Sequence, residues 1–451
     1  MSGVIGIFGG KEGNISKKMY YGLYALQHRG QVSTGIAVNN NGYLDYYKDL
    51  GLVNEVYNED SLGGLRGDIS IGQVRYAFSD EGIDKRNIEP LVIGYKNGAL
   101  GIAHDGSIAN YNSLKRSLEE KGSIFQTDLD SEVIANLIAR APKGDIVDSI
   151  RTVLEGIEGS YSLVIMTKDK LVGARDSYGI KPLSLGKLGE SYILASETCA
   201  FDTIGASFVR DIDPGEIIVI EDKRIRSIFK EKKSKAFCSF ESIYFARPDS
   251  SIDESSIYLS RIRMGKELFK EAPVDADIVI GAPDSGIISA IGFSQISNID
   301  YVEGFIKNRY VGRTFISPTK ELREQGVRIK LNVLGENVQG KKVILVDDSI
   351  VRGTTIKRSV EMLKEAGALE VHVRIASPPV TNSCHLGMDT PDRDKLVAAN
   401  KTVEEIEKDL EVDSLHYLSL RGLLRSVEGK GFCTGCLTGN YPIRKDGEKC
   451  L

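Results

Sequence analysis

Alternating apolar and polar residues mark short segments throughout the first half of the chain, and this alternation is typical of half-buried β-strands. Two stretches, Ile15–Leu26 and Asp130–Arg140, instead repeat apolar residues at helical spacing. The first half therefore predicts many short strands and a few helices. The predicted strands fall within residues 2–10, 33–40, 70–78, 98–106 and 162–169.

The second half alternates strand-like and helix-like segments. Apolar strand patterns within 277–286 and 341–349 are separated by helical stretches, which favours a mainly parallel sheet. The charged stretch Phe229–Phe237 separates the halves, and we predict one domain over residues 1–232 and a second over 238–451. A charged surface loop within a single domain is the alternative.

The segment Val343–Thr355, VILVDDSIVRGTT, carries the most specific chemistry. A buried strand ends at two adjacent carboxylates, Asp347 and Asp348, and a Gly/Thr turn then begins an amphipathic helix that ends at Gly367. Loop N–H groups and a helix N-terminus favour a phosphate, while paired carboxylates can accept hydrogen bonds from sugar hydroxyls. The segment predicts a ribose 5-phosphate site of the type I phosphoribosyltransferase kind. An ordinary βα unit with a polar turn is the alternative.

Two further loops are expected to complete this site. Ala282–Gly286, APDSG, follows a predicted strand, and Gly286 permits close backbone approach to a pyrophosphate. The basic stretch that begins at Lys307–Thr314 could close over a polyanion and exclude water, although a solvated charged loop would have the same composition. Magnesium would bridge pyrophosphate and ribose oxygens, mostly through water and one or two protein oxygens.

Composition narrows the class of protein. The 451 residues suffice for about two or three domains, and 41% hydrophobic with 27% charged residues are typical of a soluble globular protein. A net charge of −5 argues against a broad nucleic-acid surface. No apolar run approaches the ~20 residues of a membrane helix, and the first residues lack signal-peptide features. We therefore expect a cytoplasmic protein whose six cysteines are thiols or ligands.

These motifs resemble the glutamine phosphoribosylpyrophosphate amidotransferase family almost end to end. The matching stretches include YYGLYALQHRGQ, ASETCAFD, YFARPDS, IKNRYVGRTFI, VDDSIVRGTT and FCTGCLTGNYP. The resemblance implies an N-terminal nucleophile (Ntn) hydrolase domain, a sandwich of two antiparallel sheets between helices, followed by a type I phosphoribosyltransferase α/β domain. In the family, glutamine is hydrolysed in the first domain, and the ammonia attacks C1 of phosphoribosylpyrophosphate (PRPP) in the second.

The resemblance also implies binding residues and partners. Expected partners are PRPP, ammonia or glutamine, purine nucleotides as feedback ligands, and further copies of the chain in a dimer or tetramer. Magnesium is expected at Ser285, Asp347 and Asp348. The PRPP-binding residues would be Asp284, Ser285, Gly286, Lys307, Arg309, Tyr310, Arg313, Asp347, Asp348, Ser349, Arg352, Gly353, Thr354 and Thr355.

The glutaminase positions depart from the family pattern. Ser2 stands where the family has its nucleophilic cysteine, and a hydroxyl is a much weaker nucleophile than a thiol. In AHDG, Asp105 replaces the asparagine that donates to the oxyanion beside Gly106, and an ionised carboxylate can only accept. Arg75 and Asp130 still match the residues that hold the carboxylate and amine of glutamine.

Three interpretations explain these departures differently. An engineered Cys→Ser change explains Ser2 alone, and a working serine glutaminase does not explain Asp105. A glutaminase domain that has kept its fold and lost its chemistry explains both. We adopt this third interpretation, because the changes gather in one pocket while the PRPP motifs are intact.

Four cysteines occupy the positions that carry a four-iron cluster in one branch of the family: Cys238, Cys384, Cys433 and Cys436. Four thiols could equally hold zinc or remain unligated, and the resemblance favours a [4Fe–4S] cluster with a structural role.

The sequence therefore predicts an amidophosphoribosyltransferase-type enzyme of purine synthesis that binds PRPP and Mg²⁺ and takes ammonia more readily than glutamine. The alternatives are a non-catalytic PRPP or nucleotide sensor that regulates a purine enzyme, and a transferase that uses another amine acceptor.

Overall fold

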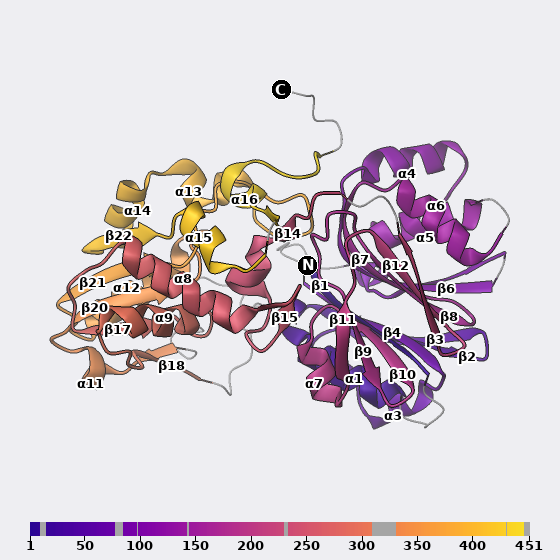
Figure 1. Ribbon diagram of the computed structural model, residues 1–451, viewed down its shortest axis with the longest axis horizontal. Helices are drawn as coiled ribbons and strands as arrows, with labels where there is room; N and C mark the ends of the chain where they lie inside the picture. Colours follow the sequence, from indigo (N-terminus) through magenta and orange to yellow (C-terminus); the bar gives the residue numbers. More distant parts are fainter. Residues whose placement is uncertain are drawn as a thin grey trace.

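The computed structural model describes residues 1–9, 15–76, 84–96, 98–141, 144–229, 233–308, 331–429 and 431–445. Two parts lie side by side, with the sheets of the amino-terminal part on the right of Figure 1 and those of the carboxy-terminal part on the left. Strands up to Phe229 form two large antiparallel sheets, whereas the strands from Ile278 onward include a parallel sheet.

The first large sheet has seven strands, and every neighbouring pair is antiparallel. It places β1 next to β4, so that Ser2 pairs with Arg75 at the end of the sheet. In spatial order the strands are β11 (Ser207–Asp211), β9 (Ser184–Leu188), β10 (Ser191–Ala195), β1 (Ser2–Phe8), β4 (Ile69–Arg75), β2 (Ser33–Asn40) and β3 (Tyr43–Leu50).

The second large sheet has six strands and is also antiparallel. Its long strand β6 carries Asp105 opposite Ser162 of β7. In spatial order the strands are β13 (Arg224–Phe229), β12 (Glu216–Glu221), β8 (Lys170–Arg175), β7 (Gly159–Met166), β6 (Gly98–Ile108) and β5 (Leu91–Tyr95).

Side-chain alternation along the strands builds three apolar layers. Val4 of β1 packs between the sheets, whereas its neighbour Ile5 packs outward against a helical layer. Helices α1 (Ile15–Ala25) and α7 (Cys199–Ile204) cover the seven-stranded sheet, and α5 (Asp130–Arg140) and α6 (Ile146–Glu155) cover the six-stranded sheet. The predicted αββα sandwich is confirmed. Shorter helices are η1 (Gln27–Arg29), α2 (Val53–Val56), α3 (Glu59–Gly64), η2 (Lys85–Asn87) and α4 (Tyr111–Glu120).

The carboxy-terminal part is built on a parallel four-stranded sheet, as the sequence predicts. Val343 and Leu345 of the central strand pack on one face and Ile344 and Val346 on the other, so both faces are buried. Its strands in spatial order are β17 (Ile278–Gly281), β20 (Lys342–Asp347), β21 (Glu370–Ile375) and β22 (Ser414–Tyr417).

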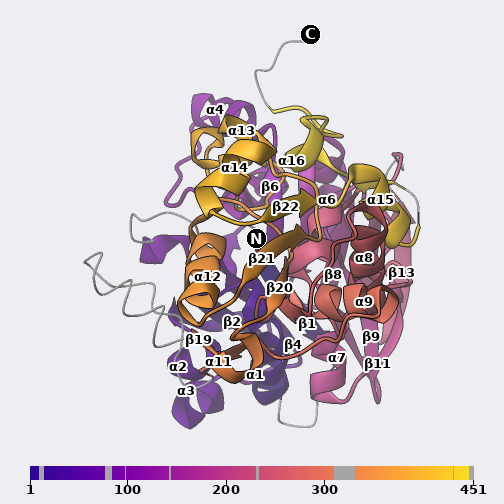
Figure 2. The same cartoon turned by 90° about the vertical axis from the view of Figure 1, so that its left-hand side faces the viewer.

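Helices cover both faces of this sheet (Figure 2). On one face lie α8 (Ile257–Glu271) and α9 (Ile287–Ser297), and on the other α12 (Thr354–Glu365) and α14 (Val403–Leu410). The predicted type I phosphoribosyltransferase architecture is confirmed. The remaining elements are β14 (Phe237–Cys238), η3 (Glu241–Phe245), β15 (Ser251–Ile252), β16 (Ser255–Ser256), β18 (Phe305–Lys307), β19 (Leu331–Val333), α11 (Gly335–Val338), η4 (Arg393–Lys395), α13 (Val397–Asn400), α15 (Leu420–Ser426), β23 (Phe432–Cys433) and α16 (Gly435–Thr438).

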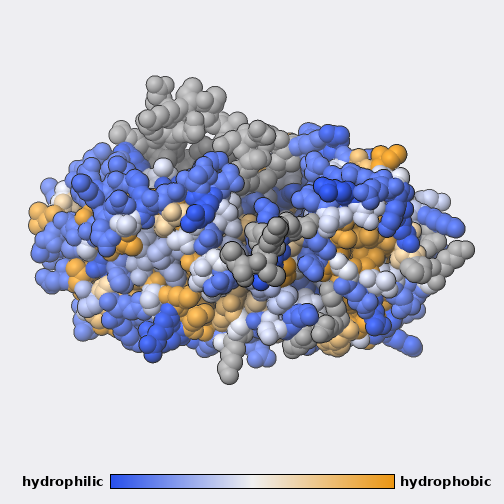
Figure 3. Space-filling view, turned by 90° about the horizontal axis from the view of Figure 1, so that it is seen from above, coloured by the Kyte–Doolittle hydropathy of each residue, from blue (hydrophilic) through white to orange (hydrophobic). Residues whose placement is uncertain are grey.

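The two parts share one apolar interior. Met1, Ala109 and Ile180 of the first part belong to the same buried cluster as Phe240 and Met388 of the second. The face seen in Figure 3 is mostly hydrophilic, with hydrophobic residues in separate groups. None of the helices in the described ranges has the length and apolar character needed to cross a bilayer.

Candidate functional site

A cavity of 460 Å³ lies at the carboxyl end of the parallel sheet, where ligands of open α/β sheets bind. The loop after β20 forms most of one side. The residues of the predicted PRPP site that line the cavity are Ser285, Asp347, Asp348, Ser349, Arg352, Gly353, Thr354 and Thr355.

Two neighbouring carboxylates stand at the end of β20. The backbone N–H of Asp348 donates to Oδ1 of Asp347 over 2.9 Å, and the Ser349 hydroxyl donates to Asp348. Burial, together with the neighbouring Asp348 carboxylate, raises the pKa of Asp347 well above its ordinary value. A ligand that brings hydroxyl donors or a divalent cation would stabilise the ionised pair, so the site suits a sugar diol with bound metal.

The helix α12 begins at the cavity wall. Gly353 precedes it with φ +81°, a left-handed conformation that favours glycine, and Thr354 and Thr355 form the first turn. The helix N-terminus presents backbone N–H groups and threonine hydroxyls to the cavity, which together favour a phosphate.

The loop after β17 differs in part from the prediction. Ser285 lines the cavity, whereas Asp284 is exposed and pairs with Lys307. At Gly286 a Cβ would lie 2.3 Å from the Val346 carbonyl oxygen and 2.9 Å from the Ala282 nitrogen. The glycine is therefore required for packing of this loop against β20, in addition to any approach by an anion. Arg309, Tyr310 and Arg313 lie outside the described residues.

Several cavity residues were not predicted from the sequence. An aromatic wall formed by Phe240, Tyr244 and Phe245 comes from the η3 region, and His28 comes from the amino-terminal part. The loop Met388–Pro391 forms another side. These residues are far from the phosphate motifs in sequence, and only the family-like stretch YFARPDS gave a signal for part of the wall.

A second cavity, of 380 Å³, lies in the amino-terminal part where the glutamine pocket was predicted. Ser2, Arg75, Gly106 and Asp130 line it, together with the loop that follows Cys384. Four residues line both cavities, so a single layer of side chains separates them: Met1, Tyr76, Met388 and Asp389.

The two residues predicted to hold the carboxylate and amine of glutamine, Arg75 and Asp130, both line this cavity. The Arg75 guanidinium lies 3.2 Å from Glu89 and from the Asn87 carbonyl, and Asp130 accepts a 3.0 Å bond from the Ile108 N–H. Burial raises the pKa of Asp130 to about 6. The pocket therefore keeps one cation and one buried carboxylate that a bound ammonium group would favour in its ionised form.

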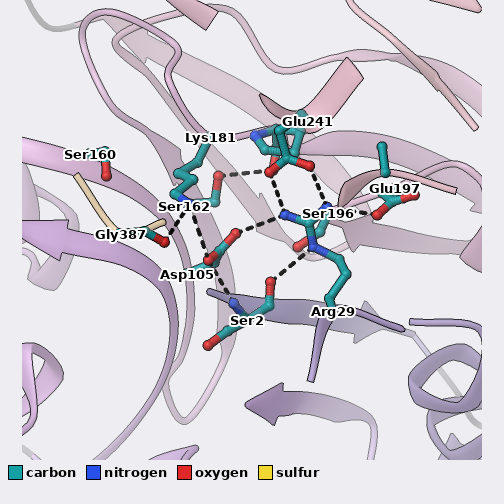
Figure 4. Close-up of polar contacts among 12 residues, drawn as sticks. Ser2, Arg29, Asp105, Ser160, Ser162, Lys181, Ser196, Glu197, Glu241 and Gly387 are labelled. Atoms are coloured by element: carbon teal, nitrogen blue, oxygen red, sulfur yellow. Dashed lines mark hydrogen bonds and ion pairs between the residues drawn. The ribbon is translucent and has the colours of Figure 1, made fainter. Parts of the chain in front are cut away.

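Asp105 is not among the residues that line this cavity, and its side chain is fully buried. It points toward Ser2, Arg29 and Lys181 (Figure 4). Its Oδ1 accepts a 2.8 Å bond from the Ser2 backbone N–H and lies 3.8 Å from Nζ of Lys181. Its Oδ2 accepts a 3.1 Å bond from Nη2 of Arg29. The prediction that Asp105 acts by facing the developing oxyanion is therefore incomplete, because its carboxylate is already engaged by cations.

The same network extends beyond Asp105. The fully buried Arg29 guanidinium donates to both oxygens of Glu241, at 2.7 and 2.8 Å, and to Glu197 at 2.6 Å. Burial alone would raise the pKa of Asp105, but Lys181 and Arg29 hold it below its ordinary value. Asp105 is therefore an ionised acceptor and cannot donate a hydrogen bond.

Comparison with known proteins places both halves in one family. The family model described as "Glutamine amidotransferase domain" matches residues 81–203, and the "Phosphoribosyl transferase domain" model matches residues 261–378. The amidophosphoribosyltransferase of Archaeoglobus fulgidus is 46% identical over 458 residues, covering 100% of both proteins. That of Bacillus subtilis is 45% identical and covers 98% of this chain and 94% of its own length. The chain belongs to the amidophosphoribosyltransferase family.

A solved structure of the same family matches the whole fold. The B. subtilis glutamine PRPP amidotransferase complexed with ADP and GMP superposes with a TM-score of 0.93 and 44% identity, covering 100% of this chain and 99% of that one. The predicted family and enzyme class are confirmed: the chain is an enzyme of the amidophosphoribosyltransferase class.

The four predicted cluster cysteines converge in the fold. Cys238 of β14 pairs in parallel register with Cys433 of β23, and the amide of Leu386 donates to Sγ of Cys384 over 3.3 Å. Burial raises the pKa of Cys436, and the nearby thiols of Cys238, Cys384 and Cys433 raise it further. The four thiols are therefore close enough to influence one another's ionisation. Within the described ranges, no group of three or more His, Cys, Asp or Glu has the arrangement needed for a single metal ion.

Proposed function

We propose that the chain forms 5-phosphoribosylamine and pyrophosphate from PRPP in purine synthesis, with ammonia in preference to glutamine as its direct nitrogen source. The 460 Å³ cavity supports the transferase half of this proposal, since a carboxylate pair and a helix N-terminus line the same space. PRPP carries a ribose diol and a 5′-phosphate, which match these two features.

The observation that supports ammonia as the nitrogen source is the buried Asp105 carboxylate. An oxyanion hole requires donors aimed at the developing charge, and loss of one donor costs about 3–4 kcal/mol. Asp105 is instead an ionised acceptor that binds the Ser2 N–H. Since Ser2 also offers a hydroxyl in place of a thiol, glutamine hydrolysis has a weaker nucleophile and lacks its oxyanion donor.

The transferase residues act by holding the substrate in the orientation that the reaction needs. Asp347 and Asp348 would hold the ribose hydroxyls, and the α12 N-terminus with Thr354 and Thr355 would hold the 5′-phosphate. Ammonia then adds at C1 as the bond from C1 to the pyrophosphate oxygen breaks, and a proton leaves the new ammonium. Loop Ala282–Gly286 would receive the pyrophosphate, and Arg352 would add positive charge. No protein nucleophile is needed, because two reactants held in line gain effective concentration.

Magnesium would be held by Ser285, Asp347 and Asp348, whose oxygens are the hard donors that this ion prefers. When bound, it would neutralise charge on the leaving pyrophosphate.

A [4Fe–4S] cluster on Cys238, Cys384, Cys433 and Cys436 is part of the proposal. A tetrahedral zinc site would hold its thiolates about 3.8 Å apart, given Zn–S bonds of about 2.3 Å. A four-iron cube is larger and spaces its thiolates more widely. The parallel pairing of Cys238 with Cys433 brings two of these thiols together, and the resemblance to the cluster-bearing branch of the family favours the four-iron group. It would join β14, the loop after β21 and the carboxy-terminal turn.

Further parts of the proposal come from the relatives. The B. subtilis structure holds ADP and GMP, and purine nucleotides are proposed as feedback ligands here. We also propose a homo-oligomer and a domain boundary between residues 232 and 238.

One experiment tests the nitrogen source. Purified protein with PRPP and Mg²⁺ is assayed for pyrophosphate in the presence of ammonium, of glutamine or of neither, and glutamate is measured in parallel. We expect pyrophosphate with ammonium and little or no glutamate from glutamine. Robust glutamate release by the unmodified chain would contradict the proposal, and a lack of pyrophosphate under every condition would contradict the transferase assignment.

A further inference from the structure

The ion network behind the predicted glutamine pocket joins the amino-terminal part to Glu241 and Gly387 of the carboxy-terminal part (Figure 4). Asp105 lies at its centre, in contact with Arg29 and Lys181, and each of these cations also contacts a residue of the other part. If PRPP binds as proposed above, these contacts position two walls of its cavity.

Arg29 fixes the aromatic wall. Its guanidinium donates two hydrogen bonds to Glu241, the first residue of η3, and the guanidinium carbon lies 5.2 Å from the centre of the Phe245 ring. Both Phe245 and Tyr244 of η3 line the transferase cavity. The guanidinium therefore holds both ends of the turn that presents these rings.

Lys181 fixes the opposite loop. Its Nζ donates to the Gly387 carbonyl over 2.9 Å, and the Ser160 hydroxyl donates to the preceding carbonyl of Leu386 over 2.7 Å. Gly387 itself packs so closely that a Cβ would lie 2.5 Å from the carbonyl carbon of Gly106. Residues Met388–Pro391, which follow directly, line the transferase cavity.

Asp105 is the carboxylate that both buried cations share. Lys181 and Arg29 are each almost completely buried, and of the described carboxylates Asp105 is the one within ion-pair distance of Lys181. Burial would lower the pKa of Lys181, but Asp105 and Glu241 raise it. An amide in place of Asp105 would remove this anion and would turn an N–H₂ group or a weaker acceptor toward Arg29.

We infer that Asp105 is a positioning residue of the transferase: it anchors Arg29 and Lys181, which hold the η3 wall and the Leu386–Pro391 loop around PRPP. Asp105 then has a role in PRPP binding, in addition to its effect on glutaminase chemistry. A change in the amino-terminal part should therefore weaken the binding of a ligand in the other part.

The test measures PRPP binding to the full chain by titration calorimetry with Mg²⁺, together with thermal stability. Asp105→Asn should raise the Kd for PRPP about tenfold, as a displacement of the cavity walls by a fraction of an ångström would. Glu132→Gln is the matched control. Glu132 is a buried carboxylate of the same part that accepts bonds from Gln126 and Thr127, and it contacts neither cation. This control should lose stability with an unchanged Kd.

A double variant separates positioning from stability. Asp105→Asn with Lys181→Met removes one anion and one cation, so the stability of the fold should recover. The Kd for PRPP should stay high, because the bond from Lys181 to the Gly387 carbonyl is gone. If Asp105→Asn leaves the Kd unchanged, or if the Kd recovers together with stability in the double variant, Asp105 is only structural and the inference is wrong. An unmodified chain that binds no PRPP would contradict the proposed function and this inference together.

Discussion

The backbone N–H of Ser2 donates a 2.8 Å hydrogen bond to the carboxylate of Asp105. The residue at the predicted nucleophile position is thus held by the residue at the predicted oxyanion position. An acceptor in this place stabilises an N–H group and offers no donor to a developing negative charge. The two substitutions therefore form one structural unit, and reversing either one alone leaves the other obstacle in place.

We expect the pair Ser2→Cys and Asp105→Asn to restore a low level of glutaminase, because the thiol and the amide donor return together. Either single variant should release about 10²-fold less glutamate than the pair, since loss of one oxyanion donor alone costs this much. Glutamate release from glutamine is the measurement. If Ser2→Cys alone is as active as the pair, Asp105 is not an obstacle.

The second prediction concerns the ribose site. Asp347→Asn replaces a charged acceptor for a sugar hydroxyl with a weaker neutral one, and kcat/KM for PRPP with ammonium should fall about 10²-fold. Asp394→Asn, at an exposed position of η4, is the control and should behave like the unmodified chain. If Asp347→Asn has the same kcat/KM for PRPP as the unmodified chain, Asp347 does not hold a ribose hydroxyl.

The pKa of Asp130 gives a pH prediction. Its pKa rises on folding from 3.8 to about 6, so the ionised form is disfavoured in the folded protein. Ionised Asp130 therefore destabilises the fold at pH values above 6. This destabilisation disappears as the pH falls toward 4, because the carboxyl is then protonated. Asp130→Asn should therefore stabilise the fold by about 3 kcal/mol at pH 8 and by almost nothing at pH 4. Denaturant unfolding at the two pH values measures this, and an equal gain at both would exclude the titration of Asp130 as its cause.

The fourth prediction concerns the cysteines. Anaerobically purified protein should be brown and carry about four irons per chain, and it should lose thermal stability when air bleaches it, because ligand binding across distant segments contributes to folding. Cys433→Ser should be colourless and poorly soluble. Cys199→Ser, which changes a buried thiol on α7, should keep its iron. Zinc, or no metal, in the anaerobic protein would contradict the cluster.

Local motifs explain which parts of the site could be predicted. Asp347, Asp348, Thr354 and Thr355 lie within nine residues of one another on a strand, a turn and a helix. Hydrophobic periodicity fixes that unit, so its ligand chemistry follows directly from the sequence. The αββα sandwich required the family resemblance in addition, because alternating strands alone do not specify how two sheets stack.

Long-range contacts explain what the sequence could not show. Lys181 meets the Gly387 carbonyl 206 residues away, and Arg29 meets Glu241 across 212 residues. Asp105 was therefore interpreted from its chemistry alone, as a group that repels an oxyanion, and its cationic partners were missed. Neither Lys181 nor Glu241 has a local pattern that distinguishes it from a surface charge.

The shared wall between the two cavities constrains how this protein can change over generations. Deletion of the amino-terminal part would take Met1, His28 and Tyr76 from the side of the transferase cavity and leave the cavity open to water. Selection that acts on phosphoribosyl transfer alone is therefore sufficient to preserve the amino-terminal sandwich, even after every residue of its own chemistry has been replaced.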